Sequence, residues 1–147
     1  MQKILIISLF VLFLAACSQK AWEKTSNGVL IHPKSKTENG AQVINLQVLS
    51  DRIIRVVASP TEQFSTAKSL CVVDNAAVPT TFEVVEQNDS LILSAAKVKA
   101  KISLVSGAVV FNDENNRLIL QERANNGKSF SPITVEGTNG YGLSQVF

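Results

Sequence analysis

The stretch that indicates the fold most directly is Lys97-Val98-Lys99-Ala100-Lys101-Ile102-Ser103-Leu104. Its side chains alternate between polar and apolar with a period of two, which in an extended strand places them on opposite faces. One buried face and one solvated face are typical of antiparallel sheets. The stretch therefore predicts a half-buried strand over residues 97–105, with the lysines on the wet side.

The same pattern continues on both sides of this strand. Short runs rich in Val and Ile are separated by turn residues, and no stretch of about ten residues keeps helical spacing without a breaker. Strands are predicted over 28–32, 41–49, 52–58, 70–73, 81–86, 90–94, 97–105, 108–111, 117–122 and 129–135. This number and spacing predict an all-β fold, an antiparallel β-sandwich. The glycine-rich stretch Gly137-Thr138-Asn139-Gly140-Tyr141-Gly142 is expected to be a flexible loop.

Length and charge restrict the class of protein. The 147 residues are one domain's worth of chain, and a (β/α)₈ barrel needs at least about 200. The net charge is only +2 and the sequence has no run of basic residues, so the charge pattern gives no support for nucleic-acid binding. The apolar strand that begins near Leu143 and stops at Phe147 suggests that the sequence is a fragment.

The first residues have the pattern of an export signal. A cationic start at Lys3 precedes the apolar run 4–14, which is shorter than the about 20 residues that span a bilayer. Leu14-Ala15-Ala16-Cys17 resembles the lipobox of bacterial lipoproteins, in which the cysteine is acylated and becomes the N-terminus. We therefore expect a signal helix over 1–16, lipidation of Cys17, a tether over 17–27 and attachment to a membrane of the cell envelope, either periplasmic or at the surface. A plain secretory signal or an uncleaved anchor is the alternative.

Metal and cofactor chemistry finds no support in the sequence. Beyond Cys17 the chain has only Cys71, which lies in an apolar run and is interpreted as a buried thiol, and a single histidine, His32. His32 stands at the end of a predicted strand, where a structural role is favoured. Asp113-Glu114-Asn115-Asn116 lacks the glycine and the glutamate of an EF-hand loop and is interpreted as an Asx-rich turn.

Catalytic side chains are equally sparse. The sequence contains no Gly-x-Ser-x-Gly elbow. Because His32 is the single histidine, it is the only residue that could serve as the base of a Ser-His-Asp triad. Paired carboxylates remain possible, although sequence cannot show whether two lie within the about 5 to 10 Å that glycoside hydrolysis needs. The carboxylates at turns or on polar strand positions, with solubility as their default role, are Glu83, Glu86, Asp113, Glu114 and Glu122.

Two further features each have two interpretations. The stripe Lys97, Lys99 and Lys101 could contact anionic lipid or acidic polysaccharide, but we favour the solvent face of an edge strand protected by charge. Trp22 is interpreted as a packing anchor for the first strand, with a sugar-stacking platform as the alternative.

Several stretches together resemble the N-terminal β-sandwich domain of bacterial glycoside hydrolase family 31 enzymes, the α-glucosidases and α-xylosidases. They are 46–56, with the core Ser50-Asp51-Arg52-Ile53-Ile54-Arg55-Val56, the hairpin region 98–122, and Trp22 with Gly28-Val29. The resemblance covers about residues 20 to 147 and implies a galactose-mutarotase-like supersandwich over 28–147, followed in the parent protein by a catalytic (β/α)₈ barrel.

The resemblance also implies where the chemistry lies. Family 31 enzymes are retaining α-glycosidases whose two catalytic aspartates are on the barrel, so no catalytic residue is expected in this chain. The family places a Tyr-Gly-Leu-Gly loop near the sugar pocket, and Tyr141-Gly142-Leu143-Ser144 is partly similar to it, so the substrate-binding residues stay open. The expected function is a non-catalytic domain of an enzyme acting on oligosaccharides. The alternative is a free-standing envelope lipoprotein that binds carbohydrate or a protein partner.

Overall fold

The computed structural model describes residues 20–66 and 80–147, and every regular element in these two ranges is a β-strand. The strands are β1 (Trp22–Thr25), β2 (Gly28–Ile31), β3 (Val43–Ser50), β4 (Ile53–Ser59), β5 (Glu83–Gln87), β6 (Ser90–Ser94), β7 (Val98–Ser103), β8 (Val109–Asp113), β9 (Leu118–Gln121), β10 (Lys128–Val135) and β11 (Thr138–Gln145). The all-β prediction is confirmed. The expected signal helix, Cys17, Cys71 and the strand expected over 70–73 lie outside the described residues.

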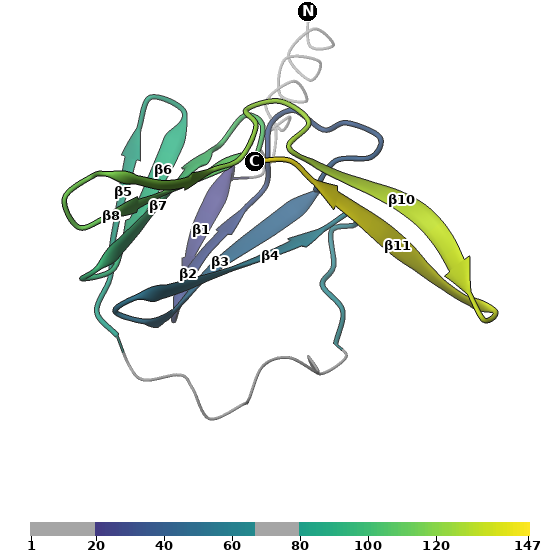
Figure 1. Ribbon diagram of the computed structural model, residues 1–147, viewed down its shortest axis with the longest axis horizontal. Coiled ribbons are helices and arrows are strands. Elements are labelled where there is room, and N and C mark those ends of the chain that lie inside the picture. Colours follow the sequence, from purple (N-terminus) through teal and green to yellow (C-terminus); the bar gives the residue numbers. More distant parts are fainter. Residues whose placement is uncertain (1–19, 67–79) are drawn as a thin grey trace, which may run out of the picture.

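The strands form two antiparallel sheets and a separate hairpin (Figure 1). One sheet has the order β1-β2-β3-β4, the other has the order β5-β6-β7-β8-β9, and β10 pairs only with β11. Consecutive strands are neighbours throughout, as expected for a chain connected by short turns. No helix in the described part of the chain is long and apolar enough to cross a membrane.

The core lies between the two sheets, which makes the fold a β-sandwich as predicted. Both sheets contribute to one cluster of buried side chains: Val29, Ile31, Ile44, Leu46, Val48, Leu91, Leu93, Ala95, Val98, Ala100, Ile102, Leu104 and Val109. The apolar members of the 97–105 stretch are therefore buried as their alternation predicts. Burial of each Leu, Ile or Val side chain stabilises the fold by about 1.5–3 kcal/mol.

Two tight turns explain the sharp hairpins. Asn88 and Asp89, between β5 and β6, have φ of 48° and 55°, and Glu136 and Gly137, between β10 and β11, have φ of 48° and 78°. Two consecutive positive φ angles are the signature of a type I′ turn, whose twist matches that of the flanking strands. The prediction of a flexible loop over 137–142 is therefore wrong: Gly137 closes a turn, and Thr138–Gln145 is strand β11.

The sandwich begins before residue 28. Strand β1 lies inside the segment 17–27 expected to be a tether, and pairs along its length with β2. Trp22 is half-buried against the core cluster, which explains why this short segment is held in the sheet. At Gly28 a Cβ atom would lie 1.8 Å from the Leu46 carbonyl oxygen, so only glycine allows β2 to approach β3 this closely.

Hairpin β10–β11 projects away from both sheets (Figure 1). Its root is nevertheless bound to the rest of the chain. The Phe130 amide donates to the Asn39 carbonyl at 2.8 Å, and the Arg123 amide donates to the Val146 carbonyl at 2.9 Å. The hairpin is thus attached at one end and free at the other.

Candidate functional site

The most deeply buried charge in the described residues is Glu122, which follows β9 and is only 2% exposed. Its carboxylate forms an ion pair with Lys128, the first residue of β10. It also accepts hydrogen bonds from the Val109 amide at 3.0 Å and from Gln145 Nε2 at 2.8 Å. Lys128 Nζ donates in addition to the Gly107 carbonyl at 3.0 Å. These contacts join β8, β10 and β11 at the root of the hairpin.

The electrostatics of this buried network depend on the pairing. Burial lowers the pKa of the Lys128 ammonium, while the hydrogen bond and the charge of Glu122 act in the opposite direction. A buried charge without its partner is far more costly than the intact pair. Gly127 leaves room for the carboxylate, since a Cβ there would lie 2.8 Å from Glu122 Cγ and 2.5 Å from the Arg123 carbonyl oxygen.

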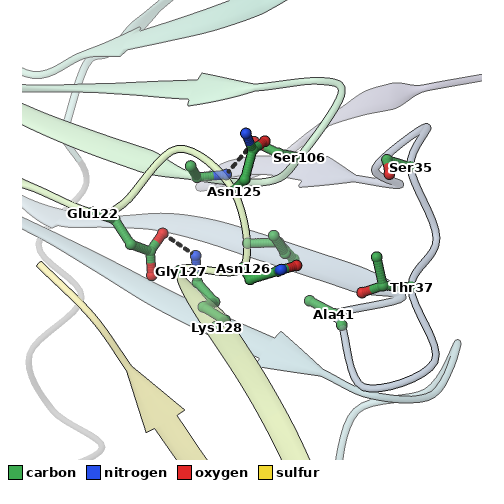
Figure 2. Close-up of a pocket in the computed structure, with 12 residues that line it drawn as sticks. Ser35, Thr37, Ala41, Ser106, Glu122, Asn125, Asn126, Gly127 and Lys128 are labelled. Atoms are coloured by element: carbon green, nitrogen blue, oxygen red, sulfur yellow. Dashed lines mark hydrogen bonds and ion pairs between the residues drawn. The ribbon is translucent and has the colours of Figure 1, made fainter.

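A small cavity lies beside the network (Figure 2). Its volume is about 60 Å³, and its lining includes Ser35, Thr37, Asn126, Glu122 and Lys128. A water molecule needs only about 10–15 Å³ of such volume, whereas pockets for drug-sized ligands measure roughly 300–1,000 Å³. This cavity can therefore hold water but not a sugar ring. The structural role of Glu122 follows from its ion pair with Lys128 and its two hydrogen bonds.

Three of the other four candidate carboxylates are also engaged in structural contacts. Asp113 Oδ1 accepts from the amides of Asn115 at 2.9 Å and Arg117 at 2.8 Å, which confirms the Asx turn predicted there. Glu86 accepts from Trp22 Nε1 at 2.7 Å. Glu114 forms an ion pair with Lys97 at 3.4 Å. The pKa of Glu114 is lowered mainly by a backbone hydrogen bond and, to a smaller extent, by Lys97. Glu83 stands exposed on β5.

His32 belongs to a surface cluster with two loop residues. Its Nδ1 lies 3.2 Å from Glu62 Oε2, and Lys36 forms an ion pair with the same carboxylate. The hydrogen bond from Lys36 lowers the pKa of Glu62. Within residues 20–66 and 80–147, no three His, Cys, Asp or Glu side chains gather as a metal site would require. The cluster resembles an exposed ion-pair network.

The expectation that the lysine stripe protects an edge strand is wrong. Strand β7, which carries Lys99 and Lys101, lies in the middle of its sheet between β6 and β8. The edge strands of this sheet are β5 and β9. The prediction failed because alternation determines which face a residue occupies but not where the strand lies in the sheet. Lys97 pairs with Glu114, and Lys99 donates to Asn116 Oδ1 at 2.7 Å.

Trp22 packs against the core as the anchoring role predicts, with its indole nitrogen bound to Glu86. Tyr141 lies on β11, half exposed, with its ring edge-on to Phe130 at a centroid distance of 6.5 Å. The buried network of Glu122, Lys128 and Gln145 could not be predicted from the sequence. Its members are separated by a turn or by many residues, so no local pattern joins them.

The fold and its contacts define a class: a β-sandwich domain in which Glu122, Asp113 and Glu114 bind cations or amides. No family model matches the chain. Among solved structures, a glycoside hydrolase family 31 α-xylosidase from Xanthomonas citri matches with 38% sequence identity and a TM-score of 0.71 over 84% of this chain. The chain spans only 13% of that enzyme.

At this identity, the likeness extends beyond the fold. The resemblance predicted from the sequence is confirmed: the chain is similar to part of a family 31 α-xylosidase, and its all-β structure fits the expected N-terminal β-sandwich domain.

Proposed function

We propose that this chain is a non-catalytic domain of a retaining α-glycosidase, an α-xylosidase or α-glucosidase that acts on oligosaccharides. The observation that carries the proposal is the 38% identity to a much longer α-xylosidase, of which the chain covers only 13%. The carboxylates described above support a structural rather than a chemical role. The glycosidic bond is then cleaved by residues elsewhere in the parent protein, and the domain supports that catalytic part. No contact in the described residues favours a free-standing carbohydrate-binding lipoprotein instead.

We expect the purified chain to leave aryl α-xylosides and aryl α-glucosides intact. The product of the complete gene, purified in the same way, is expected to release the aryl group from one of them. Hydrolysis is followed by absorbance of the released phenol. Cleavage by the chain alone at a rate similar to that of the complete protein would contradict the proposal.

We further propose that Cys17 carries the lipid that attaches the parent enzyme to a membrane of the bacterial cell envelope. The support is the apolar run 4–14 followed by Leu14-Ala15-Ala16-Cys17. Two acyl chains on one cysteine give stable anchoring, whereas a single chain does not.

Replacing this cysteine should release the protein from the membrane. In cells fed radiolabelled palmitate, Cys17→Ala is expected to abolish the label, whereas Cys71→Ala is expected to keep it. Cys71 is the matched control because it is the only other cysteine in the chain. A label that persists in Cys17→Ala would show that the acylation site is elsewhere.

A further inference from the structure

The hairpin β10–β11 carries apolar side chains that nothing in the described structure covers. In the strand register Phe130 lies opposite Leu143 and Pro132 opposite Tyr141, so these four residues share one face, here called the inner face. Phe130 is buried at the root, but Leu143 is 56% exposed and Tyr141 is also exposed. The inner face thus begins in the core and continues out of it.

The opposite face of the hairpin is mostly hydroxyl side chains and glycine, but it carries two exposed apolar residues near the tip, Ile133 and Val135. A two-stranded hairpin is at best marginally stable in water by itself, and a third strand or a packed partner is normally needed. The hairpin therefore exposes apolar side chains on the inner face, with two more on the opposite face near its tip.

Charge and backbone chemistry narrow the choice of partner. Between Ser129 and Phe147 the one charged residue is Glu136, which stands in the turn. Exposed edges are normally protected by charges or proline. Pro132 interrupts β10, since it has no amide hydrogen to donate, but β11 contains no proline. Strand β11 therefore offers an uninterrupted edge to an uncharged partner.

The last residues of the chain lie at the root end of β11. The Val146 amide donates to the Gly127 carbonyl at 2.9 Å, which fixes the last residues at the root of the hairpin (Figure 1). The matching α-xylosidase has 87% of its length outside the region that this chain covers. A polypeptide that continued from Phe147 would therefore start at the root end of β11, from which it can turn back along the open edge of that strand.

We propose that β11 is the docking edge for a further β-strand of the same polypeptide, from the part that follows Phe147 in the parent enzyme. This strand extends the hairpin into a larger sheet, and its apolar residues or those of the adjoining segment cover Tyr141 and Leu143. The buried Glu122–Lys128 pair holds the hairpin root so that the edge is presented in one orientation. The proposal rests on the proposed function, because it requires the longer parent protein.

The test is amide hydrogen exchange of residues 138–145 in the complete gene product and in the chain alone. We expect exchange in the complete protein to be at least about tenfold slower, since a paired edge strand must open before it exchanges. Leu143→Lys in the complete protein is expected to remove this protection. Val85→Lys is the matched control: Val85 is 54% exposed on the edge strand β5, and its replacement should leave β11 protected.

Three outcomes overturn the proposal. Equal exchange in the two proteins would show an uncovered edge. Protection that appears in the chain alone and rises with its concentration would identify a second copy as the occupant, and protection that appears only with phospholipid vesicles would identify a membrane. Glycosidase activity is measured on the same samples: an active enzyme with an unprotected β11 refutes the docking alone, whereas an inactive protein with a protected β11 refutes the proposed function alone.

Discussion

Replacing Glu122 with Gln should lower the free energy of unfolding of the purified chain by about 3–5 kcal/mol. The substitution leaves Lys128 buried, with a side chain 7% exposed, opposite an amide that cannot balance its charge. The Val109 amide binds Oε2 and Gln145 Nε2 binds Oε1, so the single oxygen of the new glutamine side chain can serve only one of these donors. The loss therefore combines the missing charge with one broken hydrogen bond. The measurement is urea unfolding followed by circular dichroism.

The double variant Glu122→Gln/Lys128→Met separates charge from packing. It removes both charges, and we expect it to be clearly more stable than Glu122→Gln, because no unpaired ion is left in the interior. The control is Glu114→Gln, which breaks an exposed pair with Lys97 and should leave the unfolding midpoint unchanged within error. A Glu122→Gln midpoint equal to that of the control would show that the buried pair contributes no stability.

How much the sequence predicts depends on whether the signal is local. The strand over 90–94 is confirmed with the same bounds, because turn residues flank a short apolar run on both sides. The alternation over 97–105 correctly predicts which side chains are buried. Such signals depend only on the residues of one strand and its turns. They do not report which strands become neighbours, and for this reason β7 was expected at an edge but lies in the centre.

The candidate site shows the same limit. Glu122 follows a strand with exposed side chains and precedes a polar turn, so its local pattern predicts a solvated carboxylate. It is buried because Lys128 and Gln145, which reach it from the two strands of the hairpin, supply a charge and a hydrogen bond. Trp22 is a comparable case, since β1 is too short to be recognised until its pairing with β2 is known.

Leu46→Ala should lower the free energy of unfolding by about 2–5 kcal/mol, because the truncation leaves a cavity in the core. Leu46 is fully buried on β3, the strand between β2 and β4, and belongs to the cluster that both sheets share. Leu118→Ala is the control, since Leu118 is 59% exposed on the edge strand β9 and its truncation should change stability by less than about 0.5 kcal/mol. Equal losses in the two variants would show that the shared cluster is not the main source of stability.

The same experiment reports whether the projecting hairpin unfolds with the sandwich. The chain has one tryptophan and one tyrosine, Trp22 on β1 and Tyr141 on β11, so each probe reports a different part of the fold. If the hydrogen bonds at the root make the molecule one cooperative unit, the Trp22 fluorescence and Tyr141 absorbance transitions of Leu46→Ala should shift together. A Tyr141 transition that stays in place while the Trp22 transition moves would mean that the hairpin unfolds independently. In that case the Glu122–Lys128 pair would not be sufficient to fix the orientation of β11.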